Sequence, residues 1–184
     1  MSESYVTLIT TLTSAGVGGA VALVGVYLTN KGNTARQDVQ LAHQTQIERA
    51  ELLRARGEEL YELIDKWLNN LFGYYMVKAS VMQGKLSYND GLDLELKNGK
   101  TNSGNYGRIQ MLIDVYFPAI REQYDCVLSL REATNKHVFL HKRAYERGET
   151  DGTAFLKPFT DNQLSLEAAA EKLKEAVIAQ VRAV

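Results

Sequence analysis

A run of twenty-three residues without a charged side chain, from Val6 to Leu28, constrains this chain more than any other feature of its sequence. Glu3 precedes the run and Lys31 follows it. As an α-helix the run would extend for about 34 Å, slightly more than the ~30 Å hydrocarbon core of a bilayer. Tyr5 and Tyr27 stand near its two ends, where interfacial anchors belong. The sequence therefore predicts a single transmembrane segment within residues 1–30.

Two other interpretations of this run are weaker. Residues 20–22 match the small-x-small cleavage pattern of a secretory signal, but no Lys or Arg precedes the run and the apolar sequence continues beyond that site. A water-soluble core helix would contain glycine at positions 16, 18, 19 and 25, each destabilising by up to about 1 kcal/mol relative to alanine. Glycine is common in membrane helices, so the transmembrane interpretation is preferred.

Small and hydroxylated residues recur along the predicted span at intervals of three and four, the spacing of one helix face. Small residues four apart let two helix backbones approach closely in lipid. We therefore expect a homo-oligomer that assembles through this face. Its residues are Thr11, Ser14, Ala15, Gly18, Gly19, Ala22 and Gly25. The alternatives are a marginal single span with incidental polar residues, or a pore lined by the hydroxyl groups.

The flanking charges predict the orientation of the span. No Lys or Arg precedes the run, whereas Lys31, Arg36 and Arg49 follow it. The positive-inside rule then places the N-terminus outside and the C-terminal part in the cytoplasm, at the cell membrane. Cys126 is the single cysteine, so the chain has no intrachain disulfide, as is usual in a reducing compartment.

The remainder of the chain divides into a polar stalk and a domain with a core of its own. Residues 31–52 favour a helix but carry only an interrupted apolar stripe, which is typical of an exposed, coiled-coil-like stalk. From Leu53 the stripe strengthens through Leu60, Ile64 and Trp67, so residues 53–184 are expected to form the helical domain.

Four helical regions are expected in that domain, and no alternating strand pattern interrupts them. The first ends at Gly84. A short helix at residues 89–96 follows, with Ser87 as its cap and an exposed loop at 97–107 after it. The third spans 109–148, started or kinked by Pro118, and the last begins at Thr160. The predicted fold is all-α: a transmembrane helix, a stalk and a cytoplasmic antiparallel bundle of three to four helices.

No arrangement of residues predicts catalysis, a metal or a cofactor. His137 and His141 are one helical turn apart, but four basic residues in the same segment would repel a cation. Residues 99–101 resemble the end of a phosphate-binding loop, yet Leu94 stands where that motif needs glycine. Cys126 falls between core positions and is expected to be a small buried residue. We therefore expect a protein that is not an enzyme.

The expected partners follow from charge and composition. The net charge of −1 and pI near 6.3 give no basic field, which disfavours nucleic acid. Ten tyrosines suggest either bundle packing or an aromatic partner surface. The sequence thus predicts a scaffold or partner-binding module that contacts the lipid bilayer, a second copy and an unidentified protein. The alternatives are a membrane-perturbing effector whose span is controlled by the bundle, and a spanin-like periplasmic coiled-coil protein.

Overall fold

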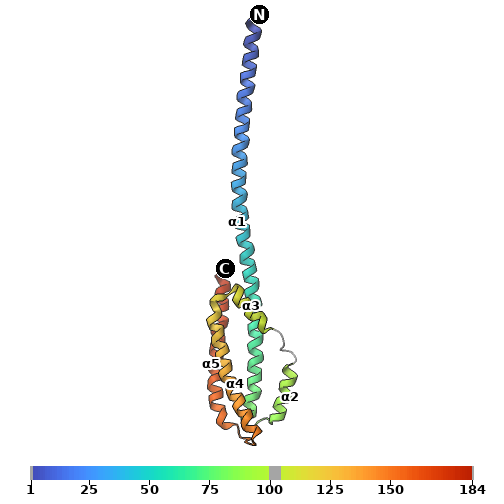
Figure 1. Ribbon diagram of the computed structural model, residues 1–184, viewed down its shortest axis with the longest axis vertical. Helices are drawn as coiled ribbons and strands as arrows, with labels where there is room; N and C mark the ends of the chain where they lie inside the picture. The colour runs from blue at the N-terminus through green and yellow to red at the C-terminus, as the bar shows by residue number, and fades with distance from the viewer. Residues whose placement is uncertain (1, 100–104, 184) are drawn as a thin grey trace. The chain divides into compact units, whose positions relative to one another are not determined.

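The computed structural model describes the backbone of residues 2–99 and 105–183 (Figure 1). Side chains are described from residue 26 onward, with positions 28, 32, 34, 35, 98–104 and 184 left out. The chain forms two compact units, residues 1–50 and residues 51–184. Every regular element in the described ranges is helical, which confirms the all-α prediction.

The first unit consists of the N-terminal part of helix α1, whose full bounds are Ser2–Met82. Every described side chain between Val26 and Arg49 is exposed, including the apolar Val39, Leu41 and Ile47. No helix, within the residues that were described, has a stretch long and apolar enough to cross a membrane. The predicted span lies outside the described side chains except for Val26 and Tyr27. The seven predicted oligomerisation residues, from Thr11 to Gly25, also lie outside them.

The second unit contains the rest of α1 and four further helices. They are α2 (Tyr88–Gly99), α3 (Tyr106–Tyr116), α4 (Arg121–Glu146) and α5 (Thr153–Arg182), with the 3₁₀ turn η1 (Pro118–Ile120) before α4. Helices α1 and α4 run in the same direction, and α5 returns antiparallel to both (Figure 1). The described part of this unit therefore contains five α-helices, among them the parallel pair α1 and α4, whereas the sequence predicts three to four antiparallel helices.

Local signals explain most of the helix boundaries. Ser87 caps α2 as predicted: its Oγ accepts a hydrogen bond from the Asp90 backbone N–H at 3.1 Å and donates one to the Asp90 carboxylate at 2.6 Å. Pro118 lacks a backbone donor and begins the turn that separates α3 from α4, so the expected single third helix is divided into two.

Two predictions for the second unit were wrong. Helix α5 begins at Thr153 and not at Thr160, because the Asp151 carboxylate accepts the Thr153 backbone N–H at 2.9 Å and Phe159 is fully buried. The helix therefore includes Pro158. Cys126 is exposed, since the inward face of α4 is occupied by Tyr124 and Val127 on either side of it.

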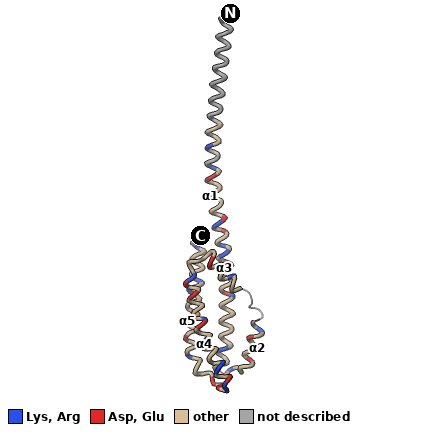
Figure 2. The backbone as a smooth tube through the Cα atoms, in the orientation of Figure 1, with Lys and Arg blue, Asp and Glu red and all other residues tan. Residues whose placement is uncertain are grey.

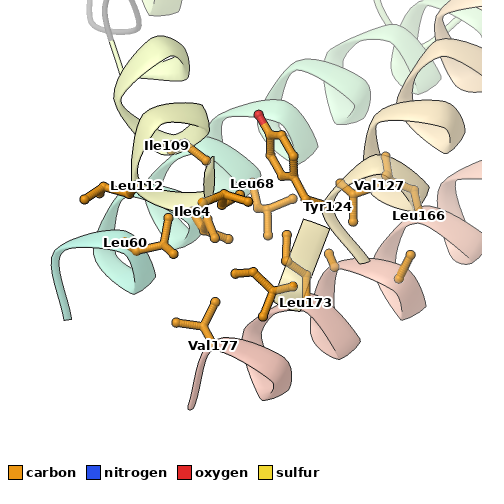
Figure 3. Packing of buried hydrophobic residues seen from close by; sticks show 14 of the residues in the cluster. Leu60, Ile64, Leu68, Ile109, Leu112, Tyr124, Val127, Leu166, Leu173 and Val177 are labelled. Carbon is orange, nitrogen blue, oxygen red and sulfur yellow. The ribbon is translucent and has the colours of Figure 1, made fainter. Parts of the chain in front are cut away.

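The core of the second unit is formed by side chains from α1, α3, α4 and α5 that converge in Figure 3. On α1 the buried positions are four and seven residues apart, the spacing of one helix face. Those residues are Leu60, Ile64, Leu68, Tyr75 and Met82. They pack with Ile109, Leu112, Val127, Leu166, Leu173 and Val177, among others. The predicted core positions Leu60 and Ile64 are thereby confirmed.

Two glycines let neighbouring segments approach α1. A Cβ at Gly91 of α2 would lie 2.6 Å from Val81 Cγ2. A Cβ at Gly152, before α5, would lie 2.6 Å from Met82 Cα and 2.8 Å from His141 Nε2. At Gly152 the nearest atom belongs to the backbone, so a side chain there requires the two segments to move apart, whereas at Gly91 the Val81 side chain would have to shift.

Candidate groove between three helices

A groove of about 540 Å³ lies between α1, α2 and α4. Its volume is within the range of small-molecule sites, about 300–1,000 Å³. Helix α1 contributes Trp67, Leu71, Tyr74 and Lys78, and α2 contributes Tyr88, Leu92 and Glu95. Most of these seven side chains are aromatic or aliphatic. One side of the groove is therefore an apolar wall with a small number of polar groups.

Helix α4 provides the opposite side of the groove with Arg131, Asn135, Val138, Phe139 and Lys142. Its positions 131, 135, 138 and 142 are spaced by four, three and four residues. The lining residues of α1 have the same spacing, so a single stripe of each helix faces the groove. Helices α1 and α4 run in the same direction (Figure 1), so the two stripes that line the groove are parallel.

One end of the groove is organised around Lys78. Its Nζ lies 2.6 Å from Glu95 Oε1, and the two side chains are only 11% and 17% exposed. The ammonium group also lies over the rings of Tyr74 and Tyr88, at 5.2 and 5.7 Å from the ring centroids. Lys78 is thus neutralised by a carboxylate and packed between two aromatic rings, which fixes α2 against α1.

The tyrosines at this end are held in their neutral form. Burial, followed by the negative charge of Glu95, raises the pKa of Tyr74 to about 12. Burial likewise raises the pKa of Tyr88, whose ring stacks on that of Tyr145 with centroids 4.3 Å apart. The groove therefore presents hydroxyl donors and aromatic faces here, with no phenolate near neutral pH.

The other end of the groove holds Arg131, a cation without a carboxylate partner in the described part of the chain. Its guanidinium carbon lies 5.7 Å from the centroid of the Tyr106 ring. Its Nε is buried and makes no hydrogen bond to any described residue. A buried donor left unpaired costs about 1–3 kcal/mol, so this group is poised for an acceptor.

Asn135 stands one helical turn beyond Arg131. The Tyr75 hydroxyl donates to Asn135 Oδ1 at 3.0 Å and lies 3.2 Å from the Arg131 carbonyl oxygen. With its oxygen engaged by Tyr75, the Asn135 amide turns its NH₂ group away from that bond. Arg131 and Asn135 therefore supply two neighbouring sets of donors on one face of α4.

The groove carries an excess of positive charge. Three cations line it, Lys78, Arg131 and Lys142, against the single carboxylate of Glu95, a difference of two charges. The Lys142 side chain is 56% exposed, and its Nζ lies 3.8 Å from Glu146 Oε1. An exposed pair at this distance contributes little to stability. Further basic residues, Lys136, Arg143 and Arg147, lie on or directly after the same half of α4 outside the groove lining, and acidic and basic residues are interspersed over much of the rest of the second unit (Figure 2).

The candidate residues from the sequence do not gather in the groove. His141 is 2% exposed, and its pKa is lowered by burial and then by the charge of Lys78. His137 is half-buried, and the described residues contain no group of three or more His, Cys, Asp or Glu side chains suited to a metal ion. Residues 100 and 101 of the loop with partial similarity to a phosphate-binding motif lie outside the described chain.

Sequence reasoning found part of this site and missed the rest. It left the tyrosines, Tyr74 and Tyr88 among them, as either bundle packing or an aromatic surface. Trp67 packs against the core as expected and also lines the groove, whereas Arg131 was given no role. The lining positions of α1 and of α4 are both spaced by four, three and four residues. This shared spacing points to a common groove only when the two helices are known to be parallel neighbours. Comparison with protein-family models, curated proteins and solved structures gave no match to this chain.

Proposed function

We propose that this chain is a membrane-anchored, homo-oligomeric helical module that binds a partner in the groove of its second unit at the cytoplasmic membrane face. The observation that carries the proposal is the contrast along α1. An uncharged N-terminal run is followed by a polar helical stretch with every described side chain exposed from residue 26 to residue 49, and then by a bundle with a closed core. This order suits an anchor, a spacer and a binding unit.

The anchoring part of the proposal is supported by the length and composition of the run from Val6 to Leu28. The small-residue face from Thr11 to Gly25 supports assembly of two or more copies in lipid. The binding part is supported by the groove, which has a ligand-sized volume and a buried donor, Arg131 Nε, without a hydrogen-bond partner. No catalytic step is proposed, because the groove unites no nucleophile with a base.

A matched pair of arginine substitutions tests the anchor. Val21→Arg places a charge in the centre of the predicted span, which costs about 2.5–3.5 kcal/mol of insertion free energy. Val39→Arg places the same charge on the stalk, where valine is 70% exposed. After membrane fractionation and carbonate extraction, the parent and Val39→Arg should remain in the pellet, and Val21→Arg should move toward the soluble fraction. Equal partition of all three would contradict the proposal.

The same chain, reconstituted, separates the module from the two alternatives. A binding module should leave dye inside vesicles at all protein concentrations that preserve the bilayer. Release that depends on oligomerisation would favour the membrane-perturbing effector. A reporter fused after Val184 should be active in the cytoplasm; activity restricted to the periplasm would favour the spanin-like protein and overturn the assigned orientation.

A further inference from the structure

The groove between α1, α2 and α4 has the chemistry of a site for a small organic anion with an aromatic ring. We infer that it binds a molecule of the nucleoside monophosphate class, with the anionic group at Arg131 and Asn135 and the ring against the aromatic wall. This inference rests on the proposed function of the second unit as a binding module, and it names the class of ligand.

The anionic group is inferred from a buried donor of the groove that lacks an acceptor. Arg131 has a buried Nε without a hydrogen-bond partner and no ion pair within the described chain. The one carboxylate of the groove, on Glu95, lies 2.6 Å from Lys78 and forms no ion pair with Arg131. A phosphate or carboxylate beside Arg131 would satisfy the buried donor and offset part of the positive excess.

The ring is inferred from the walls. Tyr74 on α1 and Phe139 on α4 line the groove from opposite sides, and Trp67 lies at the Arg131 end. Phe139 is 55% exposed, and the Arg143 guanidinium lies 5.3 Å from the centroid of its ring. Flat aromatic faces combined with cations favour a ring that stacks, as in single-stranded nucleic-acid sites. A bare inorganic anion would leave these faces in contact with water.

The volume limits the size of the ligand. A volume of about 540 Å³ is in the range of small-molecule sites and accommodates a mononucleotide. A helix or strand of a protein partner would need more room than this groove offers. The chain as a whole carries a net charge of −1, which gives no basic field for a nucleic-acid backbone. A mononucleotide therefore fits the observations better than a polymer does.

Trp67 makes the binding directly measurable, because it is the only tryptophan of the chain and lines the groove. The full chain in mild detergent is titrated with AMP, GMP, CMP and UMP while Trp67 fluorescence and heat of binding are recorded. Adenosine supplies the ring without phosphate, inorganic phosphate the anion without ring, and phosphatidylglycerol micelles the anion of a lipid. At least one nucleotide should bind ten times or more tightly than any of these three probes.

Two matched pairs of variants locate the ligand. Arg131→Met should weaken binding about tenfold or more, whereas Lys136→Met, which removes an exposed charge from the same helix outside the groove, should leave it within twofold. Phe139→Ala should weaken binding about fivefold, whereas Leu140→Ala on the neighbouring exposed position should not. Unchanged thermal unfolding of all four variants shows that the loss is local.

Several outcomes would overturn the inference. These are no binding of any nucleotide, equal binding of nucleotide and inorganic phosphate, binding of the lipid probe alone, or equal losses in Arg131→Met and Lys136→Met. None of these outcomes depends on whether the chain is held in a membrane. Failure of the ligand class is thus distinguishable from failure of the anchor, which is read from the Val21→Arg and Val39→Arg fractionation.

Discussion

The two units of the chain are both helical, but they have different reasons to be so. In the first unit, Val39 is 70% exposed and Ile47 is also exposed, so the helix gains nothing from burial at these positions. In the second unit, Leu60 and Ile64 are fully buried against other helices. Local preference and short-range pairs maintain the first, and tertiary packing maintains the second. The difference implies that equal substitutions in the two units should have unequal effects on stability.

The largest expected effect comes from a pair of identical substitutions, one in each unit. Ile64→Ala should lower the free energy of unfolding by about 2–5 kcal/mol, because it removes three buried carbons and leaves a cavity in the core. Ile47→Ala should change it by less than about 0.5 kcal/mol, because that side chain is exposed. Denaturant unfolding followed by Trp67 fluorescence measures both. Similar losses in both variants would remove the distinction between the units.

Self-association through the first unit is tested by placing a larger side chain on the predicted small-residue face. Gly18→Ile inserts a branched side chain where two backbones are expected to meet, and should cost about 1–3 kcal/mol of association free energy. Leu12→Ile and Leu23→Ile lie off this face and keep the apolar character, so they should associate like the parent. Crosslinking or mass photometry in detergent reports the change. Equal association in all three variants would mean that the small-residue face is incidental.

Close approach within the second unit is tested by a pair of glycine substitutions. Gly152→Ala would place its Cβ 2.6 Å from Met82 Cα, and should destabilise by about 1–3 kcal/mol. Gly73→Ala is an exposed position of α1 with no atom within 4 Å of the added Cβ, and should stabilise by up to about 1 kcal/mol through helix propensity. Shifts of opposite sign in thermal unfolding are expected, and stabilisation by both would show that α5 does not pack closely on α1.

Titration of the Glu59 carboxylate of α1 is expected to have a smaller effect on the stability of the fold. Hydrogen bonds from Arg108, at 2.6 and 2.9 Å, and from Arg56, at 2.8 Å, lower the pKa of Glu59 to about 2. Because the folded pKa lies below the unfolded value of 4.5, this group stabilises the fold above pH 4.5 and loses that contribution as pH falls toward 2.

The test compares how the free energy of unfolding declines with falling pH in the parent chain and in two variants. Glu59→Gln should flatten the decline of unfolding free energy between pH 4.5 and 2, since it removes the titrating group and the charge that Arg108 engages. Glu48→Gln removes an exposed carboxylate of the first unit, which accepts a hydrogen bond from the Gln44 side chain at 3.0 Å, and should leave the slope as in the parent. A parental slope in Glu59→Gln would contradict the assignment.

The sequence predicts the parts of this fold that depend on local signals. The Ser87 cap and the interruption at Pro118 were foreseen, because a capping hydroxyl and a missing donor act within one turn. The start of α5 was not, because Thr160 carries a plausible cap of its own, whereas the hydrogen bond from the Thr153 N–H to Asp151 and the burial of Phe159 accompany a start at Thr153. Tertiary packing and a second local signal together decided this boundary.

The candidate groove was less accessible to sequence reasoning for the same reason. Trp67 and Arg131 are separated by more than sixty residues, and their shared site exists because α1 and α4 pack side by side in one direction. Pattern analysis expects neighbouring helices to be antiparallel when short connections join them. Here α2 and α3 stand between α1 and α4 in the chain and allow the parallel pair.

Expression of residues 51–184 alone tests the central distinction between the two units most directly. If packing within the second unit supplies its stability, this fragment should be soluble, helical by circular dichroism, and unfold with a free energy within about 1 kcal/mol of the full chain, as read from Trp67 fluorescence. An insoluble fragment, or one destabilised by more than about 2 kcal/mol, would show that residues 1–50 are part of the folded core and would contradict the account.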